Sequence, residues 1–138
     1  MRSLRIVAAL LLAICASLAL AQDARTSEAQ AAARDWIALV DKKAYQDSWR
    51  TAGTKFQANI TAERWAQAVQ RVREPLGPVV QRSGARTKFT HQFRGAPDGD
   101  YALVLFHTSF ERKPEGQETV TLEHERDGKW RVIGYSIQ

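Results

Sequence analysis

The hydrophobic pattern of this chain changes from a helical period to a strand period near residue 79, and this change limits the fold more than any other feature. Before it, apolar residues recur every three or four positions, as in helices that bury one face. After it, apolar and polar residues alternate between short turn-forming segments. Helices followed by a run of strands predict an α+β domain, with N-terminal helices packed on a curved antiparallel sheet.

The first two expected helices are separated by a short break. Ser27 and Gln30 fit a capping box, so the first helix is predicted to begin near Ser27 and to end near Lys43. A shorter helical pattern follows from Tyr45, and Gly53 is a residue that can end it.

Thr61 can cap a third helix, which Pro75 and Pro78 should stop because proline cannot continue a helix. The expected buried face of this helix consists of Trp65, Ala68, Val69, Val72 and Leu76.

Five strands are expected after residue 78, at 79–83, 86–93, 101–110, 118–125 and 130–137. The Asp-Gly sequence at 127–128 predicts a two-residue type I′ hairpin. That turn pairs Val120 with Tyr135 and Leu122 with Ile133. The residues expected to share the other face are Thr121, Glu123, Trp130 and Val132.

Residues 1–21 have the pattern of a secretory leader. Arg2 and Arg5 precede an apolar run, and a small-residue sequence ends at Ala21. Cleavage there predicts a single domain of residues 22–138 that is periplasmic or secreted. It also removes Cys15, the one cysteine, and lowers the formal net charge from +5 to +3. A bacterial lipoprotein, with Cys15 lipidated, is the alternative, although Ile14 before it is larger than such sites require.

After residue 21 no apolar stretch approaches the roughly 20 residues that a transmembrane helix requires, so no membrane anchor is expected. Without cysteine, the mature chain is expected to have neither a disulfide framework nor a thiolate metal site.

Several short segments carry a resemblance to a known family. They are WIALVD at 36–41, SW at 48–49, REPLG at 73–77, APDGDY at 96–101, TSF at 108–110, ETVTL at 118–122 and DGKWRV at 127–132. In this order and spacing the chain resembles the small secreted bacterial proteins grouped as domain of unknown function 4019. The resemblance implies no activity and no catalytic residue. Its layout is similar to a cystatin-like or nuclear-transport-factor-2-like roll, a fold that hosts many functions.

The three histidines all fall in expected strands. If the strands expected at 101–110 and 118–125 form a hairpin that turns at 113–116, His107 faces Leu122 and His124 faces Leu105. This pairing brings the two histidines to one face. They are the candidate catalytic residues, although a slip of one residue would separate them. His91 falls on the other face, so no metal site and no cofactor are predicted.

Aromatic side chains supply the candidate ligand contacts, namely Trp49, Tyr101 and Tyr135, although core packing is the default for residues of this kind. Asp98 and Asp100 flank a glycine in a loop whose composition is typical of a turn, and they lack the spacing of a calcium loop.

Basic residues gather near the junction of helices and sheet: Arg71, Arg73, Arg82, Arg86, Lys88 and Arg94. Outside the cytoplasm we expect anionic envelope components rather than nucleic acid as partners of such a surface.

The leading functional hypothesis is a non-enzymatic secreted domain that binds a small ligand, an envelope polymer or a protein through the concave face of the sheet. The alternative is a small pocket hydrolase or isomerase that uses His107 or His124 with an acidic or tyrosine partner. A third hypothesis is a self-associating structural module, and a homodimer remains open.

Overall fold

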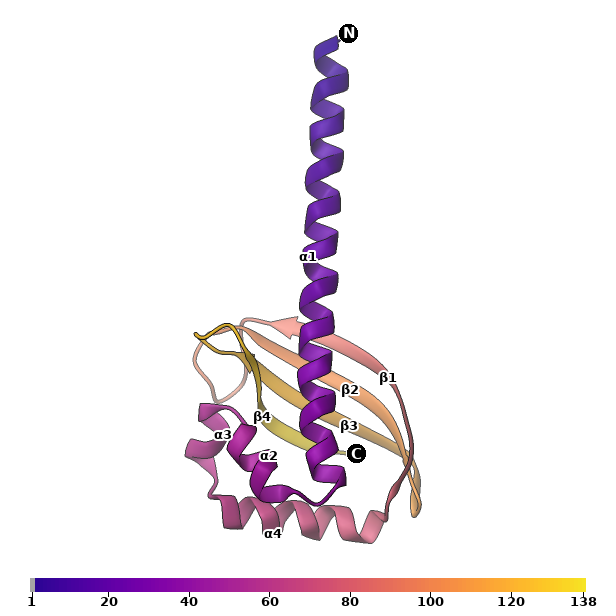
Figure 1. Ribbon diagram of the computed structural model, residues 1–138, viewed down its shortest axis with the longest axis vertical. Helices are drawn as coiled ribbons and strands as arrows, with labels where there is room; N and C mark the ends of the chain where they lie inside the picture. Colours follow the sequence, from indigo (N-terminus) through magenta and orange to yellow (C-terminus); the bar gives the residue numbers. More distant parts are fainter. Residues whose placement is uncertain (1) are drawn as a thin grey trace.

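The computed structural model describes residues 2–138, and the side chains of residues 15–84 and 86–138. A four-stranded antiparallel sheet in the order β1-β2-β3-β4 curves around the N-terminal helices (Figure 1). Helix α1 crosses the concave side of this sheet, while α2, α3 and α4 lie together at one end of it (Figure 1). The predicted α+β arrangement of N-terminal helices on an antiparallel sheet is confirmed.

Helix α1 (Arg2–Asp41) is continuous through Ser27, so the predicted start of the helix at that residue is wrong. The reason is local, because residues 1–41 contain no glycine or proline and are rich in alanine and leucine. The expected leader at 1–21 lies partly outside the side chains that the structure describes. From residue 15 to residue 24 the side chains are exposed, and the first fully buried one is Ala29.

Helix α2 (Tyr45–Thr51) lies where it is predicted, whereas α3 (Thr54–Asn59) occupies a segment in which the sequence indicates no helix. Gly53 separates the two, and its N–H donates to the carbonyl of Val132 at 2.7 Å. A Cβ atom at this position would lie 3.2 Å from that carbonyl oxygen. Glycine is therefore needed here for close approach to the sheet rather than to end a helix.

Helix α4 (Ala62–Arg73) begins as predicted, since the Thr61 hydroxyl accepts a hydrogen bond from the N–H of Arg64. A short 3-10 helix, η1 (Glu74–Leu76), follows it. The buried side chains of α4 are Trp65, Val69 and Arg73. Val72 is 51% exposed, so its predicted burial is wrong. The four-residue spacing of the buried set turns Val72 outward and Arg73 inward.

Strand β1 (Val79–Thr90) replaces the two strands predicted at 79–83 and 86–93. Its pairing with β2 shifts between Ser83 and Ala85, where Gly84 has φ +60°. The glycine therefore forms a bulge within one strand, although the sequence indicates a turn. His91 and the two residues after it belong to the loop that follows β1.

Strands β2 (Tyr101–Phe110) and β3 (Lys113–His124) turn at residues 111–112, not at 113–116. His107 consequently lies opposite Gln117, and the N–H of His124 donates to the carbonyl of Asp100. The predicted facing of His107 to Leu122, and of His124 to Leu105, is wrong. The proline and glycine at 114 and 116 indicate a turn, but they lie in the strand beside a register shift, where both are tolerated.

Strand β4 (Trp130–Ile137) pairs with β3 through a three-residue loop at 126–128. The N–H of Gly128, which has φ +81°, donates to the carbonyl of Glu125. Such a type I turn followed by a left-handed glycine replaces the predicted type I′ turn.

The predicted pairing of Val120 with Tyr135 is confirmed, but a bulge at Ile133 places Leu122 opposite Val132. The prediction that Leu122 faces Ile133 is therefore wrong. Trp130 and Val132 consequently share the core face with Leu122 instead of lying on the opposite face with Thr121 and Glu123.

The helices fill the concave face of the sheet. Trp36 of α1 packs on the ring of Trp65, at 5.7 Å between centroids, and on the ring of Tyr135, at 5.6 Å. Phe56 of α3 packs on Trp65 at 4.9 Å. These rings and the aliphatic side chains of β2, β3 and β4 form one core. The middle of the concave face is thus core and not an open binding surface.

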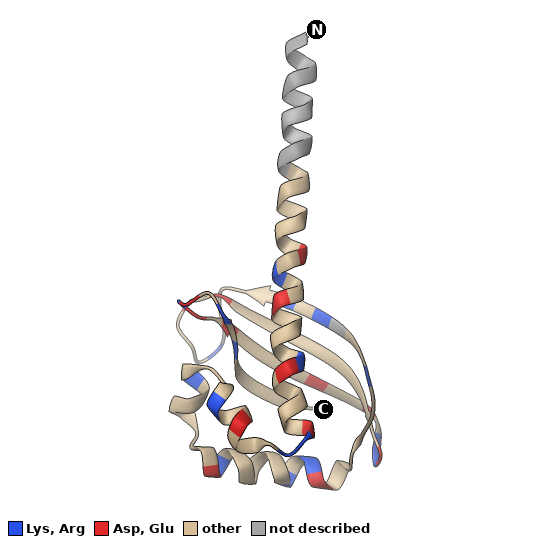
Figure 2. Ribbon diagram, in the orientation of Figure 1, with Lys and Arg blue, Asp and Glu red and all other residues tan. Residues whose placement is uncertain are grey.

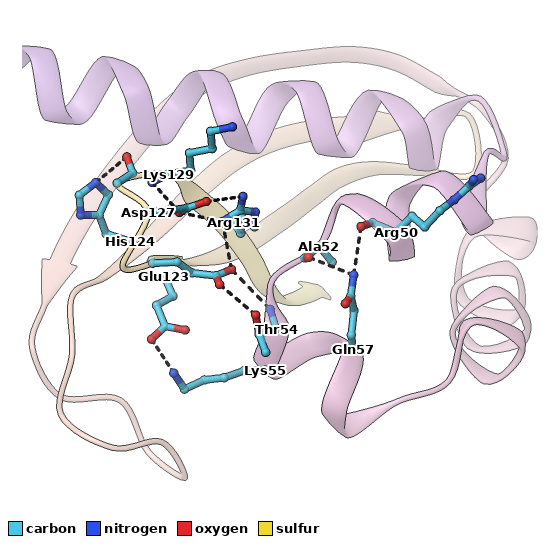
Figure 3. Close-up of polar contacts among 12 residues, drawn as sticks. Arg50, Ala52, Thr54, Lys55, Gln57, Glu123, His124, Asp127, Lys129 and Arg131 are labelled. Atoms are coloured by element: carbon cyan, nitrogen blue, oxygen red, sulfur yellow. Dashed lines mark hydrogen bonds and ion pairs between the residues drawn. The ribbon is translucent and has the colours of Figure 1, made fainter.

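Polar contacts attach helix α3 to the C-terminal end of β3, close to the turn that leads into β4 (Figure 3). The Thr54 hydroxyl donates to Glu125 at 3.0 Å, and Lys55 pairs with Glu123 at 2.5 Å. Beside them, Arg131 pairs with Asp127 at 2.7 Å. These contacts position the short helix, which is too short to be stable alone.

Candidate functional site

A carboxylate lies fully buried at the end of the sheet where α1 and α4 meet it. Glu118 of β3 accepts hydrogen bonds from Arg82 Nε at 2.8 Å and from Thr108 Oγ1 at 2.5 Å. The Tyr135 hydroxyl donates to its second oxygen, and Arg73 Nη1 lies 4.0 Å from the same oxygen. Because a buried charge is costly unless it is paired and hydrogen-bonded, these contacts make Glu118 tolerable in the core.

Asp41, the last residue of α1, binds the same two arginines. Arg82 donates to both of its carboxylate oxygens, at 2.7 and 3.0 Å, and Arg73 Nη2 donates at 2.8 Å. A two-pronged contact of this kind fixes both the carboxylate and the guanidinium. We call Asp41, Arg73, Arg82 and Glu118 the ionic cluster. It joins α1, α4, β1 and β3, with two negative and two positive charges.

Asp41, Arg73 and Arg82 of the ionic cluster keep their charges at neutral pH. Burial raises the pKa of Asp41, but hydrogen bonds from Arg82 and Arg73 outweigh it and hold that pKa below its ordinary value. Burial lowers the pKa of Arg82, yet the two carboxylates raise it above its ordinary value. Burial and then Glu118 raise the pKa of Tyr135, so its hydroxyl is a hydrogen-bond donor and not a base.

A pocket of about 780 Å³ opens beside the ionic cluster, at the C-terminal end of α1. Its volume is within the range of roughly 300–1,000 Å³ that is typical of small-molecule sites. Arg73 reaches it from α4, and the Arg73 Nε atom is buried without a hydrogen-bond partner among the described residues. The lining residues are Val40, Asp41, Lys43, Tyr45, Arg73, Glu74, Gly77, Pro78, Val79 and Arg112.

Lys43 stands at the edge of this pocket in a left-handed backbone conformation, with φ +59°. It follows α1 in a Schellman motif, in which the N–H of Ala44 donates to Leu39 and that of Lys43 donates to Val40. Glycine is the usual residue at this position, because a side chain there costs about 1–2 kcal/mol. The Lys43 ammonium group is exposed and has no ion-pair partner among the described residues.

The rim of the pocket is positive on balance. Arg112 is held over it by hydrogen bonds to the carbonyls of Pro75, at 2.8 Å, and Glu74, at 2.7 Å. Lys43 adds a second cation, whereas the Glu74 carboxylate already accepts a hydrogen bond from Gln70. The charges of the ionic cluster compensate each other, so the two rim cations exceed the single rim carboxylate.

The two candidate catalytic histidines lie apart. His107 is exposed, and it lies on the face of the sheet opposite to that of His124. His124 Nδ1 is 3.8 Å from Asp100. Its Nε2 is 3.0 Å from the carbonyl of Gly128 (Figure 3). Among the described residues, no carboxylate or phenol lies within hydrogen-bond distance of either ring. His91 Nδ1 contacts the carbonyl of Gly99 in a loop.

Of the three candidate ligand-binding aromatic residues, Tyr135 alone contacts the ionic cluster. Trp49 donates from Nε1 to the carbonyl of Ile60 at 2.8 Å. Tyr101 is fully buried and donates to the carbonyl of Pro97 at 2.6 Å. Both therefore hold loops in place and lie outside the pocket.

The basic residues near the junction of helices and sheet do not form one surface. Arg73 and Arg82 turn inward into the ionic cluster, while Arg86 and Lys88 are exposed on β1. Lysine and arginine are spread over several elements of the described chain (Figure 2). The expected basic patch is thus partly a set of internal ion pairs.

Sequence reasoning missed Asp41, Lys43 and Glu118. Glu118 could have been found, because it lies two and four positions before Val120 and Leu122 and so shares their inward face. An acid at an inward position of a strand requires a cationic partner, which directs attention to buried arginines. Nothing in the local sequence indicates the left-handed conformation of Lys43.

The part of the chain that the structure describes holds no group of three or more His, Cys, Asp or Glu residues arranged to bind a metal ion. Over the same residues, no helix is both long enough and apolar enough to pass through a membrane.

The architecture defines a class of small α+β domain, in which helices fill the concave face of a four-stranded antiparallel sheet. More particularly, the chain belongs to the family described as "Protein of unknown function (DUF4019)", whose model matches residues 32–135. No curated protein matches the chain. A solved structure from Catenulispora acidiphila is similar with a TM-score of 0.47 and 18% identity, over 86% of this chain and 94% of that one.

Proposed function

We propose that this chain is a secreted or periplasmic binding domain, and that it takes a small organic anion in the pocket beside the ionic cluster. The observation that carries the proposal is Lys43. It is kept in a strained conformation at the rim, and strained residues concentrate at functional sites. A lysine in place of the glycine that the turn favours costs stability, which a role in binding would explain.

The lining of the pocket supports an anion with an apolar body. Val40, Pro78 and Val79 offer apolar wall, and Lys43 and Arg112 offer cations at the rim. A carboxylate held by these cations would leave its hydrocarbon part against the apolar wall. The site therefore fits a compact aromatic or aliphatic carboxylate, for which benzoate is a suitable probe.

Secretion is a further part of the proposal, and the exposure of the N-terminal residues supports it. Side chains at 15–24 are exposed, and burial begins at Ala29. Cleavage after Ala21 would therefore remove no buried side chain from the described part of the helix. An intact mass that begins at Gln22 without lipid is expected, whereas a lipid attached at Cys15 would refute cleavage at Ala21.

Replacing Lys43 with glycine tests the binding site, because binding and stability should change in opposite directions. Glycine relieves the left-handed conformation, so Lys43→Gly should raise the free energy of unfolding by about 1 kcal/mol. The same change should weaken benzoate binding at least fivefold, as measured by isothermal titration calorimetry at low salt.

Lys42→Gly is the matched control. Lys42 is the exposed neighbour of Lys43 and does not line the pocket. This control should leave benzoate affinity unchanged. If the wild-type protein does not bind benzoate or longer carboxylates at millimolar concentration, or if Lys43→Gly binds them equally well, the anion pocket is refuted.

A further inference from the structure

At the other end of the packed part of α1, the guanidinium of Arg25 lies against two aromatic rings. Its Cζ atom is 4.5 Å from the centroid of Phe89 and 5.4 Å from that of Trp130. The guanidinium also pairs with the carboxylate of Asp100. The ring of His124 packs on Trp130, with centroids 4.8 Å apart. We call Phe89, Asp100, His124 and Trp130 the aromatic cage.

This combination of groups is suited to binding a cation. Aromatic faces attract a guanidinium or ammonium group through the ring quadrupole, and a carboxylate supplies the opposite charge. The four residues of the cage come from β1, β4, the end of β3 and the loop before β2, so none of them belongs to α1. Arg25 is the one part of the arrangement that comes from the helix.

Arg25 is weakly held for a residue in such a site. The side chains at 22–24 are exposed, and the first fully buried side chain toward the C-terminus is Ala29. If the chain begins at Gln22, Arg25 lies in the first turn of the helix, where the helix dipole disfavours a cation and the backbone frays. Lifting one turn would therefore uncover the rings of Phe89 and Trp130 and leave Ala29 and the buried residues after it in place.

We propose that the aromatic cage is a binding site for the arginine side chain of a partner polypeptide, and that Arg25 is its internal competitor. The proposal is independent of the anion pocket, which lies at the other end of the packed part of α1. An incoming arginine would replace Arg25 on the faces of Phe89 and Trp130 and pair with Asp100. Arg25 then lowers the affinity of the site by occupying it.

The test uses Arg25→Ala in the purified protein, with the blocked tripeptide Gly-Arg-Gly as the probe. Binding is followed by the NMR signal of the Trp130 indole N–H, which is assigned with Trp130→Phe. Removal of the competitor should tighten peptide binding at least tenfold relative to the wild type. Adding Asp100→Asn to Arg25→Ala should abolish this gain.

Arg34→Ala is the matched control, because Arg34 is another arginine of α1 and lies over a different ring, that of Phe106. It should leave peptide affinity unchanged. Tighter binding of the peptide than of free arginine supports a polypeptide source for the ligand, while the reverse order overturns that assignment.

The neutral isostere Gly-citrulline-Gly tests the role of charge. It should not shift the Trp130 signal. Equal binding of the citrulline peptide, or equal affinity of the wild type and Arg25→Ala for the arginine peptide, would overturn the proposed cation site.

Discussion

The two ends of the packed part of α1 hold charges in opposite ways. At its C-terminus Asp41 binds Arg73 and Arg82, whose side chains are 9% and 16% exposed, in front of the fully buried Glu118. Sixteen residues earlier, Arg25 pairs with Asp100 where both side chains are about one-third exposed. Asp41 opposes the helix dipole at the C-terminus of α1, and its arginine partners compensate for this. The difference in burial implies that the ionic cluster is essential to the fold, whereas the Arg25 contact is dispensable and free to exchange.

The largest expected effect is at the buried end. Glu118→Ala would leave Arg82 and the Tyr135 hydroxyl without their shared acceptor in the protein interior, and Arg73 without one of its two neighbouring carboxylates. Breaking a buried ion pair by removing one partner costs about 3–5 kcal/mol. We therefore expect a loss of that size in the free energy of unfolding, measured by urea denaturation at pH 7.

Glu115→Ala is the control for this substitution, because Glu115 is an exposed glutamate on the same strand. It should change stability by less than about 0.5 kcal/mol. A loss below about 1 kcal/mol for Glu118→Ala, within the range typical of surface pairs, would remove the distinction between the two ends of the helix.

A smaller effect is expected where β3 passes close to β2 beside the ionic cluster. A Cβ atom on Gly116 would lie 2.6 Å from the carbonyl oxygen of Thr108, whose hydroxyl binds Glu118. Gly116→Ala should therefore push β2 and β3 apart and cost about 1–3 kcal/mol. The measurement is the urea midpoint together with the thermal unfolding temperature.

Gly134→Ala is the control for Gly116→Ala, because Gly134 also lies in a strand of the sheet. A Cβ at Gly134 would meet Thr121 at 3.6 Å, which is an ordinary contact distance. This variant should therefore change stability by less than about 0.5 kcal/mol. Equal losses for Gly116→Ala and Gly134→Ala would mean that the cost arises from strand flexibility and not from the crowding of Thr108.

The class of fold could be predicted from the sequence, because the class depends on the period of the apolar residues. The cap at Thr61, the helix from Tyr45 and the pairing of Val120 with Tyr135 all follow from local patterns. Strand register was not predictable in the same way. Gly84 and Gly116 indicate turns by composition, but tertiary pairing uses them for a bulge and for a close strand approach.

The candidate site depended on register, which is why it was largely missed. A shift of five residues in the β2–β3 pairing separates His107 from His124 and sends them to opposite faces. The ionic cluster draws on four elements far apart in the sequence, so no local motif marks it. The aromatic cage has the same character, since Phe89 and Trp130 meet only after β1 and β4 curve toward α1.

The smallest effect is expected at the exposed end. Asp100→Asn removes the partner of Arg25, but both groups are partly in water, and pairs of this kind contribute roughly 0–1 kcal/mol. Unfolding by urea should therefore change by less than about 1 kcal/mol. Hydrogen exchange should respond more strongly, with faster exchange confined to the turn of α1 that holds Arg25. A loss comparable to that of Glu118→Ala would show that the Arg25 contact supports the fold, and an arginine held so firmly could not exchange with an incoming ligand.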